Sequence, residues 1–155
     1  MRKFHIFTDL DGTLLGKEDY RYEVNMQLIS DLKGKGIGIS LNTSKTLSET
    51  ECWQYKLGLD SPFIIENGAA ILFPKNKFEL EQLKPHKVES RGRYFCIVLG
   101  MKIDSLECLY QPYAERVTSL MHCSKNEAMS LTGLGGSDLH RARTREFTLP
   151  LIIPD

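Results

Sequence analysis

The sequence has no excess of charge of either sign. Its 20 Lys and Arg residues balance its 20 Asp and Glu residues, so the formal net charge is +0 at pH 7. Proteins that bind nucleic acids or anionic membrane surfaces usually carry a marked positive charge. The balance therefore gives no electrostatic case for a nucleic-acid or membrane partner.

Long hydrophobic runs and paired cysteines are also absent. No apolar run approaches the roughly 20 residues of a membrane-spanning helix, and the N-terminus leads straight into a strand-like segment instead of a signal peptide. No CxxC pair or metal-ligand spacing occurs, so we expect reduced, structural thiols. These features predict a cytoplasmic protein. The four cysteines are Cys52, Cys96, Cys108 and Cys123.

The remaining composition is that of a globular protein. Hydrophobic residues make up 41% and charged residues 26% of the 155 residues, which is typical of a folded domain rather than a disordered chain. This length predicts one ordinary domain, or one domain with a small insertion.

Two carboxylates directly follow the first apolar run. The segment 4–15 reads FHIFTDLDGTLL, in which Asp9 and Asp11 precede Gly12. The run predicts a buried strand, and a loop that begins at Asp9 can turn both carboxylates toward one crevice at the strand end, where α/β sheets place their chemistry. A simple Asp-Gly turn with solvated aspartates is the alternative. A calcium-binding EF-hand fits less well, because its glycine stands at the sixth position and Gly12 stands at the fourth.

Paired carboxylates of this kind are suited to phosphoryl transfer. One Asp can attack phosphorus to form an acyl phosphate, while the other donates a proton to the leaving oxygen and later activates water. A hard cation would reduce the repulsion between carboxylate and phosphate, and Mg²⁺ fits because it takes one or two carboxylates together with waters.

A segment suited to anion binding follows the next predicted strand. The pattern predicts a helix over 23–35 and a buried strand over 37–41, and such a succession implies a right-handed crossover and a parallel pair. Asn42-Thr43-Ser44-Lys45-Thr46 comes next and opens a helix, with a capping box at either Thr46 and Glu49 or Ser48 and Glu51. One interpretation is that these hydroxyls only cap the helix. The other is that the backbone N–H groups at the helix N-terminus, together with Lys45, bind an anion.

A third apolar segment is interrupted by Glu66-Asn67-Gly68. Residues 63–65 and 69–73 predict strands, and the Asn-Gly pair predicts a two-residue hairpin turn between them. The polar stretch 74–92 is expected to be a linker. A strand over 94–99 is then expected to start a second α/β unit, with a helical pattern over 104–117 that Pro112 interrupts and a capped short helix from Ser124 to Leu131.

On these motifs the sequence resembles the haloacid dehalogenase (HAD) superfamily. FTDLDGTLL is similar to its first motif, and Asn42-Thr43-Ser44-Lys45-Thr46 is similar to the second motif of the mannosyl-3-phosphoglycerate phosphatase family. The resemblance implies Asp9 as nucleophile and Mg²⁺ ligand, and Asp11 as general acid and base that gives the metal its backbone carbonyl. It also implies a phosphate contact from Thr43, supported by Ser44 and Lys45.

The resemblance also bears on two later segments. It puts the ENGA turn beside the active site, with Asn67 as a phosphate contact. The window 137–145 holds His140, Arg141, Arg143 and Arg145, which can be a solvated helix face. The resemblance singles out Arg145, since guanidinium binds carboxylates in a bidentate manner, as the residue that grips the glycerate carboxylate of the substrate.

The expected fold class is α/β, with an incomplete parallel HAD-like Rossmannoid sheet at 1–84 and a partial α/β cap domain at 85–155. The resemblance implies a Mg²⁺-dependent phosphatase of mannosylglycerate biosynthesis, acting on a small phosphorylated sugar. The later Lys and the acidic Gly-Asp motif of such enzymes are missing, so the chain is expected to be a fragment. Another HAD sugar-phosphate phosphatase, an inactive remnant and a complementing C-terminal half remain alternatives.

Overall fold

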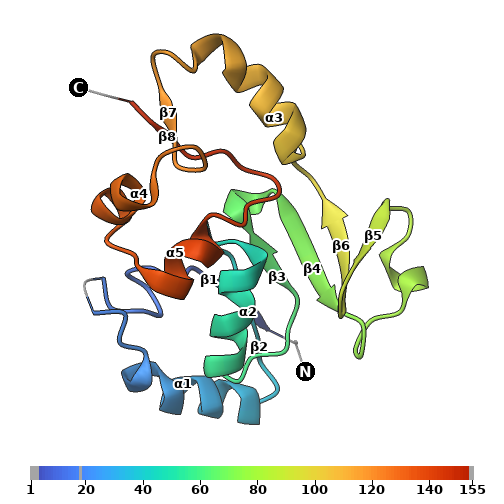
Figure 1. Cartoon of the computed structure of the whole chain (residues 1–155). Coiled ribbons are helices and arrows are strands. Elements are labelled where there is room, and N and C mark those ends of the chain that lie inside the picture. The colour runs from blue at the N-terminus through green and yellow to red at the C-terminus, as the bar shows by residue number, and fades with distance from the viewer. Residues whose placement is uncertain (1–3, 18, 154–155) are drawn as a thin grey trace.

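A computed structural model gives the fold of the chain and describes residues 4–17 and 19–153 (Figure 1). None of the helices in these ranges is long and apolar enough to cross a membrane. The strands are β1 (His5–Thr8), β2 (Gly38–Leu41), β3 (Phe63–Ile65), β4 (Ala70–Pro74), β5 (Val88–Arg91), β6 (Tyr94–Val98), β7 (Thr118–Ser119) and β8 (Leu151–Ile152). The α-helices are α1 (Glu23–Gly34), α2 (Leu47–Lys56), α3 (Ile103–Tyr110), α4 (Lys125–Thr132) and α5 (Gly136–Ala142).

The strands form a parallel pair beside an antiparallel sheet. β1 and β2 are parallel, with Ile6 opposite Ile39, as the strand–helix–strand pattern predicted. A single parallel bridge between Asn42 and Ile64 joins β2 to β3. From there the order β3-β4-β6-β5 is antiparallel throughout. The α/β fold class is therefore confirmed, with a mixed arrangement of strands.

Helix boundaries agree well with the local sequence signals. α1 begins and ends within one residue of the predicted limits, and α2 begins directly after Thr46, as predicted. The capping box of α2 forms at Thr46 and Glu49, and not in the alternative register at Ser48. α4 is capped by Ser124 and Glu127, and α3 gives way to a 3₁₀ turn (Gln111–Tyr113) that contains Pro112.

The core lies between α1, α2 and the strands next to them. Aliphatic and aromatic side chains from β2, β3 and β4 meet those of the loop after β1, and Phe147 reaches the same cluster from the C-terminal segment. Burial of this kind supplies most of the stabilising free energy of a small domain. The least exposed members are Leu10, Leu15, Leu41, Leu57, Phe63, Ile65, Ala70, Leu72 and Cys96.

Three predictions about local structure were wrong. β1 is not buried: Phe7 is 63% exposed, because β1 pairs only with β2 in the part of the chain that the structure describes. The ENG segment is not a two-residue hairpin, since Ile65 pairs with Ala70 and residues 66–69 lie between them. The stretch 74–92 is not only a linker, because it contains β5.

β6 also differs from its expected place at the start of a second unit. It pairs with β4 along its whole length, so the hydrogen-bonded sheet crosses the boundary expected at residue 84. The division into a core and a cap stays a prediction. In Figure 1 the chain leaves the sheet after β6 and passes into α3, at the opposite end of the molecule from α1.

Candidate active site

The first part of the site is the loop after β1. Asp9 is exposed where the strand ends, whereas the next residue, Leu10, is buried. The Leu10 carbonyl accepts hydrogen bonds from the backbone N–H groups of Thr13 (3.1 Å) and Leu15 (2.8 Å). Gly12 has φ +71°, which favours glycine. This tight loop directs Asp9 and Asp11 away from the core.

The second part is the segment after β2. Its backbone is held on both sides, because Asn42 N–H donates to the Thr8 carbonyl (2.8 Å) and Thr43 N–H donates to the Ile64 carbonyl (3.1 Å). Thr43 is buried, and its hydroxyl accepts a hydrogen bond from the Lys45 N–H at 3.2 Å. Residues 43–45 are therefore fixed between β1 and β3, next to the N-terminus of α2.

An ion pair joins the two strand ends. Lys45 Nζ lies 2.9 Å from Asp11 Oδ1, and the two side chains are 11% and 40% exposed. The ring of Tyr20 lies 5.5 Å from the same ammonium group, within the range of a cation–π contact. The structure thus brings the Asp9–Asp11 loop together with the Thr43–Lys45 segment, as the parallel strands predicted.

The ENG turn packs against the second segment. Glu66 N–H donates to the Lys45 carbonyl (3.0 Å), and Asn67 N–H donates to the Thr43 carbonyl (3.1 Å). Both residues have positive φ, +48° and +59°, which is uncommon for residues other than glycine. These two bonds to the neighbouring segment explain why a wider turn replaces the predicted hairpin. They also place Asn67 beside Thr43, with its side chain exposed.

Arg145 reaches the same region from the C-terminal segment. Its Nη1 donates to the Ser44 carbonyl (3.2 Å) and to the Thr148 hydroxyl (2.7 Å). Ser44, Asn67 and Arg145 line an open hollow of about 530 Å³ together with residues 147–150. Arg145 is therefore close to the predicted phosphate-binding segment, although 101 positions separate it from Ser44.

Arg141 and Arg143, from the same window, have structural contacts. Arg143 Nη2 donates to the carbonyls of Met121 (2.6 Å) and Cys123 (3.1 Å). Arg141 pairs with Asp138 at 3.4 Å, and its carbonyl accepts a hydrogen bond from the Thr46 hydroxyl at 2.9 Å. This last bond ties the end of α5 to the start of α2.

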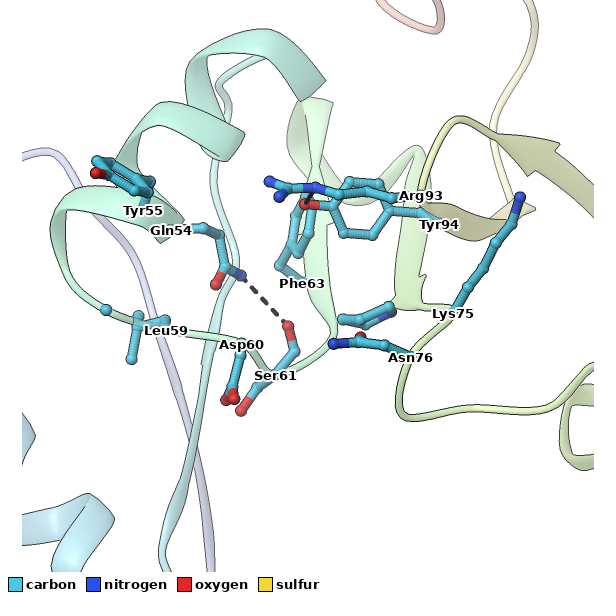
Figure 2. Close-up of a pocket in the computed structure, with 12 residues that line it drawn as sticks. Gln54, Tyr55, Leu59, Asp60, Ser61, Phe63, Lys75, Asn76, Arg93 and Tyr94 are labelled. Carbon is cyan, nitrogen blue, oxygen red and sulfur yellow. Dashed lines mark hydrogen bonds between the residues drawn. The ribbon is translucent and has the colours of Figure 1, made fainter.

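Two further hollows lie in the surface of the described residues. One of about 370 Å³ is lined by Lys45, Arg141 and Trp53 among others, and its lining holds four basic and four acidic side chains. A hollow of about 640 Å³ lies elsewhere, between the end of α2 and the strands β3, β4 and β6 (Figure 2). In it Gln54 donates to the Ser61 carbonyl at 3.4 Å. None of the predicted site residues line this hollow.

The carboxylate oxygens of Asp9 and Asp11 provide part of the ligand set that a hard cation needs. Asp9 and Asp11 offer carboxylate oxygens, the ligand type that Mg²⁺ prefers, and Mg²⁺ commonly takes one or two carboxylates with waters in the remaining positions. Within 4–17 and 19–153, no cluster of three or more His, Cys, Asp or Glu side chains is suited to a metal. The two aspartates are thus a partial site.

Sequence reasoning missed two contacts that shape this region. The Glu66 carboxylate is buried and accepts hydrogen bonds from residues 146–148, and Thr46 bonds to α5 as well as capping α2. The capping box was a visible signal for Thr46. No local signal shows that a Glu in a polar turn is buried, since its partners lie far along the chain.

Comparison with known proteins shows which families and relatives this chain is similar to. A family model described as haloacid dehalogenase-like hydrolase matches residues 6–97. A glucosyl-3-phosphoglycerate/mannosyl-3-phosphoglycerate phosphatase of Persephonella marina is 36% identical over 154 residues, which are 97% of this chain and 55% of that protein. A mannosyl-3-phosphoglycerate phosphatase of Pyrococcus furiosus is 41% identical over 101 residues, 65% of this chain and 39% of that protein.

Another relative and a solved structure agree with these matches. A glucosyl-3-phosphoglycerate/mannosyl-3-phosphoglycerate phosphatase of Methanococcoides burtonii is 33% identical, over 94% of this chain and 54% of that protein. The chain thus spans about half the length of these relatives. The crystal structure of a hypothetical protein from Geobacillus kaustophilus HTA426 has a TM-score of 0.59 at 17% identity and covers 86% of this chain and 50% of that chain. That likeness concerns the fold alone.

Proposed function

The chain belongs to the haloacid dehalogenase-like hydrolases, and on that premise we propose that it hydrolyses a phosphomonoester through a phosphorylated aspartate. The observation that best supports this proposal is the 2.9 Å ion pair between Lys45 and Asp11. It joins the ends of two parallel strands. Paired carboxylates follow the first strand, and a helix N-terminus suited to anion binding follows the second. Chemistry in α/β folds is concentrated at such strand ends.

The proposed reaction has two steps. A carboxylate oxygen of Asp9 attacks phosphorus, the bond between phosphorus and the ester oxygen breaks, and Asp11 gives its proton to the leaving alcohol. Water then attacks the phosphorus of the acyl phosphate while Asp11 takes its proton. The second step releases inorganic phosphate and returns Asp9 to its carboxylate form.

Lys45 has a role that follows from its position. In the structure its ammonium group neutralises Asp11, and a phosphate dianion in the crevice would compete for that group. Transfer of the Lys45 contact from Asp11 to the phosphate would bind the substrate and leave the Asp11 carboxylate free to take up from solvent the proton that it gives to the leaving alcohol. The buried Thr43, whose amide bonds to β3, would keep the phosphate-binding backbone in place.

We also propose that Asp9 and Asp11 hold Mg²⁺. When bound, the cation would reduce the charge repulsion between phosphate and carboxylate. A complementing C-terminal half that supplies the later Lys and acidic residues of the family stays part of the proposal, and co-purification of a second polypeptide would test it. We retain residues 85–155 as part of the proposed cap domain.

The proposed substrate is mannosyl-3-phosphoglycerate, and the product is mannosylglycerate. The names of the relatives support this choice, and Arg145 offers a guanidinium for the glycerate carboxylate beside the phosphate-binding segment. Two of those names include the glucosyl ester, so the glucosyl compound is the first comparison in a substrate profile. Core motifs report the chemistry, whereas substrate choice depends on the residues around them.

The proposal predicts the effect of Asp9→Asn. We expect the chain, assayed with any polypeptide that co-purifies with it, to release phosphate from mannosyl-3-phosphoglycerate in the presence of Mg²⁺, and the variant to lose this activity by at least about a thousandfold, because the nucleophile is removed. Hydroxylamine added during turnover should convert Asp9 to a hydroxamate, which mass spectrometry of the peptide detects. Asp104→Asn, in an exposed position of α3, is the matched control and should behave as the unchanged chain.

Two outcomes would contradict the proposal. Equal phosphate release with Asp9→Asn would rule out Asp9 as the nucleophile. No release by the unchanged chain, with either the mannosyl or the glucosyl ester, would contradict activity of these 155 residues.

A further inference from the structure

The Glu66 carboxylate is buried at a junction of three segments. Glu66 is 1% exposed, and a buried charged group is stable only when its hydrogen-bonding capacity is met. Oε1 accepts from the Glu146 N–H (3.0 Å), and Oε2 accepts from the Phe147 N–H (3.0 Å) and the Thr148 hydroxyl (2.7 Å). All three partners are consecutive residues of the C-terminal segment, so one carboxylate fixes that segment.

The backbone of Glu66 is held equally firmly on the opposite side. Its N–H and that of Asn67 bond to the carbonyls of Lys45 and Thr43, at 3.0 and 3.1 Å. Both residues adopt the left-handed conformation, which costs free energy and persists only where surrounding contacts impose it. The turn therefore connects the predicted phosphate-binding segment directly to residues 146–148.

The contacts continue from Glu66 to Arg145. The Thr148 hydroxyl donates to Glu66 and accepts from Arg145 Nη1 (2.7 Å), so it uses its single donor on one residue and an acceptor site on the other. The same Nη1 atom donates to the Ser44 carbonyl. Arg145 has a long side chain with several rotatable bonds, and this chain of bonds limits its orientation at the hollow that Ser44 and Asn67 line.

A separate ion pair steadies the same segment from β5. Arg91 Nη1 lies 2.6 Å from the Glu146 carboxylate and Nη2 lies 2.9 Å from Glu89. The hydrogen bond from Lys102, together with those from Arg91, holds the pKa of Glu89 below its ordinary value. These groups are more exposed than Glu66, so solvent screens them and they constrain the segment less.

We propose that Glu66 is a positioning residue, which docks the segment 146–148 onto the ENG turn and thereby orients Arg145 for the carboxylate of the substrate. This inference rests on the proposed function. It means that Glu66, a residue of the turn, helps the protein to select phosphoesters that carry a carboxylate. Glu66 touches neither phosphate nor sugar in this scheme. It acts through Thr148 and the backbone on either side of it.

The test compares mannosyl-3-phosphoglycerate, which carries a carboxylate, with glycerol 3-phosphate, which lacks both the carboxylate and the mannosyl group. For Glu66→Gln we expect the KM for mannosyl-3-phosphoglycerate to rise about tenfold, the size expected when hydrogen bonds to a charged group are lost. The KM for glycerol 3-phosphate, which has no carboxylate, and kcat for both esters should stay unchanged. Thr148→Val, which cuts only the link between Glu66 and Arg145, should show the same selective effect, and Thr148→Ser should restore the original ratio.

An activity-independent measurement separates docking from catalysis. Amide hydrogen exchange at Glu146 and Phe147 should be faster in Glu66→Gln than in the unchanged chain, while exchange in β2 stays the same, which shows that the variant folds. Equal loss for both esters in Glu66→Gln and Thr148→Val, or unchanged exchange at residues 146 and 147, would overturn the positioning role. Absence of hydrolysis of either ester by the unchanged chain would instead overturn the proposed function, whatever the exchange result.

Discussion

Lys45 is the residue whose side chain connects the two halves of the candidate site. Its ammonium group is largely buried and pairs with Asp11 at 2.9 Å, and the ring of Tyr20 lies near it. In a partly desolvated position such a charge interacts more strongly than it does at the surface. Lys45 is therefore the residue at which anion binding is tested most directly.

Lys45→Gln should weaken inhibition by inorganic phosphate. We expect the inhibition constant to rise tenfold to a hundredfold, because a charge-assisted hydrogen bond contributes about 1.5–3 kcal/mol. Lys35→Gln changes the net charge equally at an exposed position after α1 and is the matched control. Equal inhibition of Lys45→Gln and the unchanged chain would mean that phosphate does not contact this ammonium group.

The cysteines should differ sharply in their reactivity. Burial raises the pKa of the Cys96 thiol to about 11, so little thiolate exists at pH 8, whereas Cys108 is exposed. Because the thiolate is the reactive form, iodoacetamide at pH 8 should label Cys108 first and Cys96 only after unfolding. Peptide mass spectrometry over time measures both sites. Simultaneous labelling of the two in the folded chain would contradict the buried position of Cys96.

At the scale of elements, the start of α2 combines local and distant contacts. Thr46 is fully buried and caps the helix, and its hydroxyl also donates to the Arg141 carbonyl at the end of α5. Ser124 caps α4 through the same type of box in a more exposed position. The two caps therefore provide an internal comparison of a local cap with one that also joins two helices.

Thr46→Ala should destabilise the chain more than Ser124→Ala does. Loss of a cap costs about 1 kcal/mol, and loss of the hydrogen bond to the Arg141 carbonyl, which keeps Thr144 as a donor, adds about 0.5–1.5 kcal/mol. Urea unfolding followed by the fluorescence of Trp53, the single tryptophan, gives both values. Thr46→Ser keeps the hydroxyl and should recover most of the loss; similar midpoints for the two alanine variants would argue against the contact with α5.

The sequence predicted those elements whose signals are local. Helical periodicity and the box at Thr46 and Glu49 located α1 and α2, and the apolar runs located β2 and β3. The parallel order of β1 and β2 then brought Asp11 toward Lys45. The hairpin predicted at the ENG turn failed because of distant partners, since residues 66 and 67 bond to residues 43 and 45. β5 was missed although its partner is near in sequence: it forms a hairpin with β6 in which Arg91 lies opposite Tyr94.

At the scale of the whole molecule, both β1 and α1 expose large apolar side chains. Phe4 is 67% exposed, and Phe7, Val24 and Leu28 are also exposed. In the described ranges β1 has a strand partner on one side only. An exposed strand edge with large apolar side chains favours pairing between chains.

This surface predicts self-association that depends on concentration. Phe7→Lys should lower the average mass measured by light scattering at high protein concentration, because a charge on an exposed strand opposes pairing. Leu109→Lys, at an exposed position of α3, is the matched control and should leave association unchanged. A single monomeric mass for the unchanged chain at all concentrations would contradict the prediction.

The positions of the Glu66 partners in the sequence also determine when the hydrogen bonds between Glu66 and residues 146–148 can form during synthesis. The ribosome adds Glu146 to Thr148 80 to 82 positions after Glu66, which takes roughly 4 to 16 seconds at about 5–20 residues per second. Until then the nascent chain carries the carboxylate without its three donors, so water must solvate it and the turn stays open. Arg145 can therefore dock only after residues 146–148 have been synthesised, and slower translation of residues 67–148 would prolong the time during which the ENG turn lacks its partner segment.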